Sequence, residues 1–168
     1  MILTPDIEVK FLVESNAIEG EYSSEALEDA VGAWRYAKKI KAMLPGDVLV
    51  IHHFLMRRIR PDIAGKWRNC EVFIGGLRKD NLGPVMLESK VREVTDQVNH
   101  PVSRRAKHPY KDQRCIEYHV KFEEIHPFED GNGRVGRILY NWHRIKLGLP
   151  VHVIEAKYRK DYYLWFRK

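Results

Sequence analysis

The chain has 168 residues, of which 44% are hydrophobic and 31% are charged, and its formal net charge is +6. These values fit one globular domain with a sizeable core, and no apolar run approaches the roughly 20 residues of a membrane-spanning helix. The first residues lack the basic and apolar regions of a signal peptide. The modest positive charge favours anionic partners such as nucleotide phosphates, whereas no nucleic-acid-binding signature accompanies it. We therefore expect neither a membrane protein nor a dedicated nucleic-acid-binding protein.

Hydrophobic periodicity predicts a mostly helical chain with one small hairpin. The expected helices cover residues 6–19, 24–43, 48–59, 85–99, 110–125, 131–147 and 157–167. Ser23 or Ser24 is the expected N-cap of the second helix, and Asp47 is expected to cap the third. Residues 61–84 carry several glycines and the β-prone run Glu71-Val72-Phe73-Ile74, which predicts an irregular loop with a hairpin. Cys70 and Cys115 fit neither a metal site nor a disulfide framework, so we expect reduced thiols in the cytoplasm.

The segment 126–137 reads HPFEDGNGRVGR and directly follows a predicted helix. Pro127 prevents the helix from continuing through His126, and Phe128 is the apolar residue expected to anchor the loop. Gly131 and Gly133 permit close backbone approach and unusual dihedral angles. A new helix is expected to begin there, so its free N–H groups and positive dipole end would form an anion site at the loop.

Charged and titratable side chains surround this anion site. Arg134 and Arg137 lie three residues apart on one helical face, and two guanidiniums beside a helix N-terminus suit a polyphosphate. Asp130 is an oxygen ligand of the kind that binds Mg²⁺. His126 titrates near neutral pH and can accept a proton from an attacking hydroxyl. The spacing is that of neither a Walker loop nor a protein kinase, so the sequence indicates nucleotide chemistry in another architecture.

The segment resembles the Fic family motif HPFx[D/E]GNGRxxR at every specified position, and the resemblance extends over about residues 10–165. It implies a single mainly α Fic domain over residues 1–168, a helical bundle with a small β-hairpin flap beside the active-site loop. It also implies transfer of AMP from ATP to a Ser, Thr or Tyr hydroxyl of a target protein, with release of pyrophosphate. By this resemblance His126 is the general base and Asp130 binds Mg²⁺.

The resemblance also assigns the phosphate-binding residues. Asn132 and the backbone around Gly131 and Gly133 would hold the α-phosphate, Arg134 the β-phosphate and Arg137 the γ-phosphate. The intact Gly-Asn-Gly sequence favours AMP transfer over the phosphorylation that the Doc branch performs. Residues 65–68 and 71–76 resemble the family's flap. The residues expected to contact the target there are Val72, Phe73, Ile74 and Gly75.

A second motif lies near the N-terminus. Residues 15–20 read SNAIEG and match [S/T]xxxE[G/N], the inhibitory motif of the Fic class that carries its inhibitor in the same chain. The resemblance implies an inhibitory helix within residues 1–22, with Ser15 and Glu19 as its functional residues. A carboxylate–guanidinium pair between Glu19 and Arg137 would remove the γ-phosphate clamp. The motif at 126–137 is then expected to be complete yet weakly active.

Several alternatives stay open at this stage. Glu19 could instead orient water for removal of AMP from a target, and the chain could be a nucleotide- or DNA-binding regulatory module without turnover. The sequence specifies neither the oligomeric state nor the target, which is either another protein or the chain itself. Asn141 either contacts the ribose or base or is a helix-surface amide. The tyrosines 158, 162 and 163 either wall the adenine or are core or exposed aromatic residues. The histidines 52 and 53 are expected to be structural or surface residues.

Overall fold

The computed structural model describes residues 6–74, 77–103 and 105–167. The helices are α1 (Ile7–Ile18), α2 (Ser24–Lys39), α3 (Pro45–Met56), α4 (Gly83–Asn99), α5 (His108–Ile125), α6 (Asn132–Lys146) and α7 (Arg159–Tyr163), with the 3-10 helices η1 (Ala156–Tyr158) and η2 (Leu164–Phe166) flanking α7. Strands β1 (Val72–Ile74) and β2 (Leu77–Lys79) pair in antiparallel orientation. The mainly α class with one hairpin is thus confirmed. None of these helices combines the length and the apolar character needed to cross a membrane.

The helix boundaries follow local capping. The Ser23 hydroxyl accepts a hydrogen bond from the Ala26 N–H at 3.2 Å, as expected of an N-cap. Helix α2 ends at Lys39, earlier than the expected Met43. Met43 is instead buried in an extended connector, whose backbone N–H and C=O bond to the side-chain amide of Asn99 at 2.9 and 2.7 Å.

The third helix also differs from the expected range. It begins at Pro45, before the predicted Val48, because proline fits the first helical position. Asp47 does stabilise this terminus, but from inside the first turn, where it accepts a hydrogen bond from the Leu44 N–H at 2.9 Å. The last turn ends at Met56.

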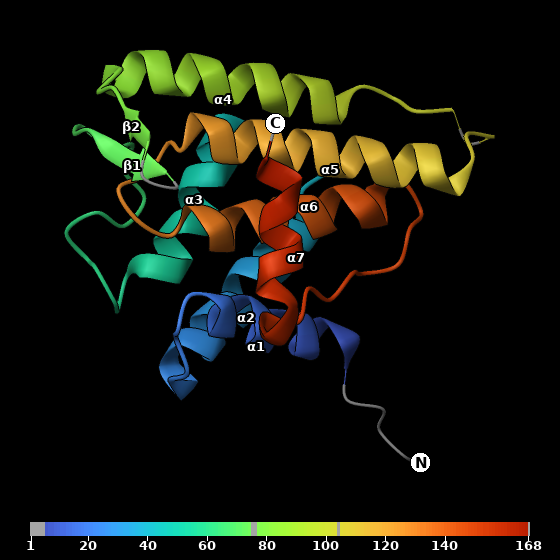
Figure 1. Cartoon of the computed structure of the whole chain (residues 1–168), viewed down its shortest axis with the longest axis horizontal. Coiled ribbons are helices and arrows are strands. Elements are labelled where there is room, and N and C mark those ends of the chain that lie inside the picture. The colour runs from blue at the N-terminus through green and yellow to red at the C-terminus, as the bar shows by residue number, and fades with distance from the viewer. Residues whose placement is uncertain (1–5, 75–76, 104, 168) are drawn as a thin grey trace.

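Helix α6 lies in the middle of the bundle and contacts α1, α2, α3 and α5 (Figure 1). The main core includes Phe11 of α1, which packs edge-on against Trp34 of α2 with ring centroids 5.5 Å apart. A second buried cluster joins the end of α1 to α5, α6 and α7; its fully buried members are Ile18, Cys115, Tyr140, Leu149, Ile154 and Tyr162. The N-terminal helix is therefore part of both cores.

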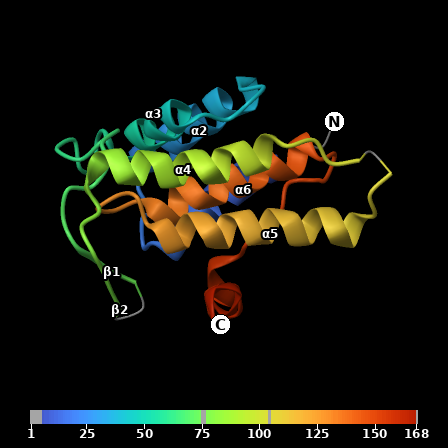
Figure 2. The same cartoon turned by 90° about the horizontal axis from the view of Figure 1, so that it is seen from above.

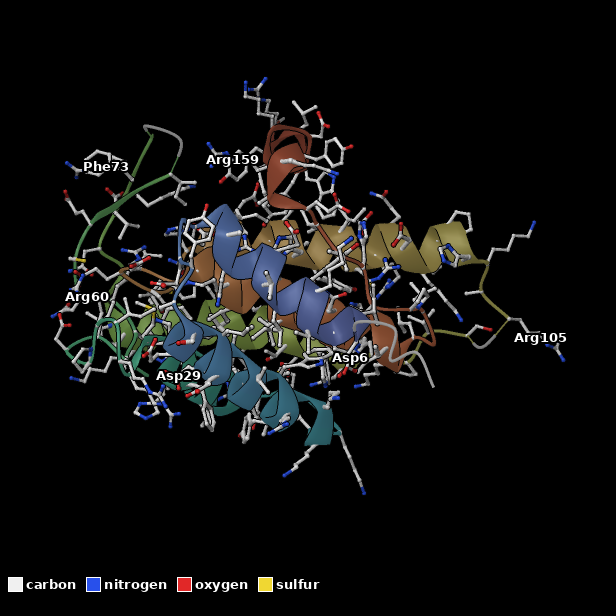
Figure 3. The ribbon with its side chains drawn as sticks, turned by 90° about the horizontal axis from the view of Figure 1, so that it is seen from below. Asp6, Asp29, Arg60, Phe73, Arg105 and Arg159 are labelled. Carbon is white, nitrogen blue, oxygen red and sulfur yellow. The ribbon has the colours of Figure 1, made fainter. Side chains whose placement is uncertain are left out.

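The hairpin, which we call the flap, projects from the same side of the bundle as α7 (Figure 2). Its register pairs Val72 with Lys79 and Phe73 with Arg78. Figure 3 shows that α1 runs from Asp6 across this side toward the flap, so that its C-terminal end lies near the base of both projections. The loop 126–131 between α5 and α6 is bonded to the segment before the flap, where the Arg68 N–H donates to the Pro127 carbonyl at 3.0 Å.

Candidate active site

His126 ends helix α5 in a left-handed conformation, with φ 49° and ψ 62°. Its N–H donates to the Phe122 carbonyl at 3.1 Å, and Pro127 then turns the chain away from the helix axis. The His126 ring is mostly buried, and its Nδ1 lies 3.3 Å from the Glu123 carbonyl oxygen. Burial lowers the pKa of His126, so the imidazole is neutral and able to accept a proton near pH 7.

The loop after His126 is held by two interactions. Phe128 is fully buried and stacks on the His52 ring at 3.7 Å and on the Trp67 ring at 5.2 Å, which confirms its role as an anchor. The Asn132 side chain bridges the Phe128 backbone, with its Nδ2 donating to the carbonyl at 2.8 Å and its Oδ1 accepting from the N–H at 2.9 Å. Asn132 thus sets the shape of the loop, and its amide is already engaged there.

The start of α6 leaves no room for a side chain at its cap. Gly131 is the N-cap and has a positive φ of 79°. A Cβ at this position would lie 2.8 Å from the Met56 sulfur. The Gly131 N–H donates to the Asp130 carboxylate at 2.5 Å, and the Asp130 side chain is 56% exposed. This carboxylate is oriented by the helix terminus and remains open to a ligand.

Arg134 is buried in the first turn of α6. Its Nη2 lies 3.2 Å from the Met56 sulfur and 4.0 Å from the Asp130 carboxylate. Its Nε has no hydrogen-bond partner within the described ranges. Burial lowers the pKa of this guanidinium, and a desolvated cation with an unused Nε–H donor favours an anionic ligand.

Arg137 is 1% exposed and is held by α1. Its Nε donates to the Ser15 hydroxyl at 2.9 Å, and its Nη2 donates to the Ser15 carbonyl at 2.9 Å and to the Glu19 carboxylate at 2.7 Å. The guanidinium also lies over the Tyr162 ring, 5.7 Å from its centroid. The structure therefore contains the expected Glu19–Arg137 ion pair.

Glu19 also reaches the first turn of α6. A Cβ added to Gly133 would lie 2.5 Å from the Glu19 Oε1 and 2.9 Å from the Arg137 Nη1. The carboxylate therefore lies against the helix N-terminus where the sequence predicts an anion site. The side chain of Glu19 is 36% exposed, so solvent reaches it.

His52 is structural, as one of its two expected roles, but no pattern in the sequence indicates its partners. Its Nδ1 accepts a hydrogen bond from the Gly65 N–H at 3.0 Å, so its Nε2 carries the proton and donates to the Asp130 carbonyl at 3.0 Å. Burial lowers the pKa of His52 to about 4, which keeps the ring neutral. His52 thus connects α3 to the loop before the flap and to the motif loop.

Arg68 has a similar connecting role. It is buried, and its guanidinium donates to the carbonyl oxygens of His126 at 2.8 Å, Cys70 at 2.6 Å and Asp80 at 2.9 Å. The backbone N–H of Arg68 also donates to the Pro127 carbonyl at 3.0 Å. One side chain therefore fixes both ends of the flap to the residue that carries the imidazole.

Other expected site residues lie elsewhere. Asn141 is fully buried, and its amide bonds to both backbone groups of His152 at 3.1 and 2.8 Å. The alternative of a helix-surface amide is therefore wrong, because Asn141 is buried and anchors the chain after α6; its contact with the ribose or base stays a prediction. Tyr158 and Tyr162 line an open pocket of about 330 Å³, whereas Tyr163 is exposed. In the flap, Phe73 is 67% exposed and Val72 is buried; Gly75 lies outside the described residues.

A profile of the Fic/DOC family matches residues 42–143. Among curated relatives, "Protein adenylyltransferase Fic" of Aedes aegypti is 30% identical over 122 residues, and that of Drosophila willistoni is 32% identical over 117 residues. Each match covers 70% of this chain and 22% of the relative, so the chain spans about a fifth of their length. Fic-1 (aa134–508) of C. elegans has the same fold, with a TM-score of 0.77 and 21% identity over 96% of this chain and 55% of that one. A Fic domain containing signaling protein of Bacteroides thetaiotaomicron gives a TM-score of 0.75 at 18% identity, over 94% of this chain and 69% of that one.

Proposed function

Because this chain belongs to the Fic/DOC family, we propose that it transfers AMP from ATP to a Ser, Thr or Tyr hydroxyl of a protein and releases pyrophosphate. The observation that carries this proposal is the arrangement around the start of α6. A neutral imidazole, an open carboxylate and two buried guanidiniums converge on one helix N-terminus. The names of the curated relatives support the same reaction.

The reaction requires a base and a polyphosphate site. His126 would accept the proton of the target hydroxyl while the hydroxyl oxygen attacks the α-phosphorus. The bond from the α-phosphorus to the bridging oxygen breaks, and pyrophosphate leaves. The N–H groups at the start of α6 would hold the α-phosphate, and Arg134 and Arg137 would bind the β- and γ-phosphates, where charge develops.

The residues present fit a magnesium ion bound together with ATP. Asp130 supplies one exposed carboxylate beside the helix terminus, and the described residues contain no group of three side chains that would hold a metal by themselves. Mg²⁺ is commonly bound by one or two carboxylates and the substrate phosphates. When bound, the ion would neutralise charge on the phosphates, and Asp130 would orient it.

The resting protein is proposed to be autoinhibited. Glu19 occupies the guanidinium that the γ-phosphate needs and lies against the first turn of α6. ATP would then bind with its α-phosphate misaligned, and a displacement of about 1 Å can lower a rate by about 100-fold. Ser15 supports this state by holding Arg137 in place.

The flap is the proposed site of the target protein. The exposed Phe73 and the free backbone edge of a two-stranded hairpin suit an extended peptide that adds a strand.

The pocket beside Tyr162 is proposed to receive the base, because Tyr162 also contacts Arg137. Cys70 and Cys115 are free thiols, which supports the proposal of a reducing compartment such as the cytoplasm.

Incubation with α-labelled ATP and Mg²⁺ tests the function. Glu19→Gly is expected to incorporate label into itself or an added protein fraction, with a mass gain of one AMP, and the double variant with His126→Ala is expected to incorporate none. Label in both variants would exclude His126 as the base. ATP binding without incorporation by Glu19→Gly would support the regulatory module instead.

Removal of AMP is the second candidate reaction, and the partial exposure of Glu19 favours it because a water can reach that carboxylate. Wild type and Glu19→Gly would be incubated with a target already carrying AMP. Loss of AMP with wild type alone would assign Glu19 to this reverse reaction.

A further inference from the structure

Glu123 lies in the last turn of α5, three residues before His126. Its side chain is 12% exposed, and its Oε2 lies 3.9 Å from the His126 Nδ1. The Glu123 carbonyl oxygen lies 3.3 Å from the same nitrogen. Two oxygens of one residue therefore face Nδ1, which favours the tautomer with the proton on Nδ1 and leaves Nε2 free as the base.

The space for this carboxylate depends on Gly136 of α6. A Cβ at Gly136 would overlap the Glu123 Oε1 and would lie 2.8 Å from the His119 ring. The Oε1 is buried and has no hydrogen-bond partner among the described residues. A buried oxygen without a partner is costly, and such groups occur at catalytic sites. Gly136 is one of the unspecified positions in the motif HPFx[D/E]GNGRxxR.

We propose that Glu123 is a positioning residue that acts through His126, orienting the ring by Nδ1 and stabilising the imidazolium formed during the reaction. This inference rests on the proposed AMP transfer. The target proton moves to Nε2, the Nδ1 proton stays between the ring and Glu123, and the new positive charge faces the carboxylate. The proton on Nε2 is later released to solvent. A carboxylate that orients a catalytic histidine has the same role in hydrolytic triads.

Several charged or titratable groups surround Glu123. They are His119 and His126 on α5 and its cap, Arg137 on α6, Tyr162 on α7 and Glu19 at the end of α1. Burial raises the pKa of Glu123 to about 7; Arg137 opposes this shift and Glu19 adds to it. Burial lowers the pKa of His119 to about 3, so that ring stays neutral.

These shifts give a pH dependence with a definite sign. The active pair is ionised Glu123 with neutral His126, and it forms only above the higher of the two pKa values of the coupled pair. Because the pKa of His126 is lowered by burial and that of Glu123 is about 7, the acid limb of kcat/KM is expected near pH 7. Without the Glu123 carboxyl group, the acid limb of kcat/KM would depend on the pKa of His126 alone and would move to lower pH.

The test uses the released variant Glu19→Gly as the parent. Adding Glu123→Gln is expected to lower kcat by about 10- to 100-fold, to leave the KM for ATP unchanged and to move the acid limb below pH 6.5. Glu117→Gln, at an exposed position of the same helix, is the control and is expected to match the parent. If Glu123→Gln lowers the rate but leaves the acid limb of kcat/KM in place, Glu123 has only a structural role and the proposal is overturned.

An NMR titration of the His126 ring needs neither turnover nor a released variant. The resonance, identified by its loss in His126→Ala, is expected to shift near pH 7 in wild type as Glu123 ionises, and the shift is expected to vanish in Glu123→Gln. The absence of that shift in wild type overturns the proposal even if Glu123→Gln fails to fold. If the His126 resonance does shift with Glu123 but Glu19→Gly transfers no AMP, the pairing of Glu123 with His126 is supported and the proposed function is rejected.

Discussion

Ser15 and Arg137 are joined by two hydrogen bonds, from Nε to the Ser15 hydroxyl and from Nη2 to the Ser15 carbonyl, both at 2.9 Å. The guanidinium is thereby fixed in the orientation that gives its third bond to Glu19. The ion pair between Glu19 and Arg137, which we propose to be inhibitory, therefore depends on a neighbour that carries no charge.

Ser15→Ala is expected to raise AMP transfer by about 10-fold, less than Glu19→Gly. The change removes one hydrogen bond to a charged group, worth about 1.5 kcal/mol or more, while the ion pair remains. Initial rates of label incorporation measure the effect. Ser24→Ala removes an exposed serine hydroxyl and should behave as wild type; equal rates for both alanine variants would contradict a role of Ser15.

Asp130→Asn is expected to lower AMP transfer by about 100-fold in the Glu19→Gly background and to weaken its dependence on Mg²⁺. The amide can keep a contact to the Gly131 N–H but loses the charge that a hard cation needs. Rates across a Mg²⁺ titration, and after chelation with EDTA, provide the measurement. Glu129→Gln, at the exposed neighbour paired with Arg60, should retain the parent Mg²⁺ response. An Asp130→Asn protein with that same response would remove Asp130 from the metal site.

Arg68→Lys is expected to lower stability by about 2–4 kcal/mol and to reduce AMP transfer. A single ammonium group lacks the fork that reaches three carbonyls, so buried acceptors lose their partner. Urea unfolding and label incorporation would both be measured. Arg78→Lys changes an exposed flap arginine and should alter stability by less than about 0.5 kcal/mol. Full activity and stability in Arg68→Lys would show that the flap does not depend on this side chain.

His52 is expected to make stability depend on pH. Its folded pKa of about 4 lies below the ordinary value of 6.5, so the unfolded chain binds the proton first. The stability it contributes is complete above pH 6.5 and is lost as the pH falls toward 4, with a loss of about 2 kcal/mol at pH 5. His52→Gln should flatten the decrease between pH 7 and 5 in urea unfolding. His53→Gln, at the exposed neighbour, should leave the slope unchanged, and an unchanged slope in both variants would contradict the buried neutral ring.

The sequence predicts the structure best where a residue lies in a recognisable motif. Phe128 lies in a motif whose proline and glycines fix the loop, and it is buried as expected. The pairing of Glu19 with Arg137 was predicted from two separate motifs, and the ion pair is present. The expected helix bounds lie within three residues of the observed ones except at the ends of α2 and α7. The predicted end of α2 ignores a connector that Asn99 stabilises from α4, and the last helix is an α-helix only over Arg159–Tyr163, with 3-10 turns on either side.

The sequence does not indicate the partners of residues that bind distant backbone, although His52 is structural, which is one of its two expected roles. His52 acts because Gly65 and Asp130 come to its two nitrogens, and no pattern around residue 52 indicates either partner. Asn141 has the spacing of a ligand-facing residue, yet its amide meets the backbone of a returning segment. A side chain that bonds to backbone far away in the chain leaves no periodic pattern in the sequence, so such contacts cannot be predicted from the sequence alone.

The burial of Phe11 and Leu12 in the main core limits how the protein can be switched on. Undocking the whole of α1 would open that core. We therefore expect nucleotide binding to be coupled only to the end of α1, where Ser15 and Glu19 hold Arg137. By reciprocity, any effector that withdraws Glu19 strengthens nucleotide binding by the same factor by which the nucleotide favours the withdrawn state. Under the proposed autoinhibition, activation would need only a rotation of the partly exposed Glu19 side chain, within an otherwise unchanged fold.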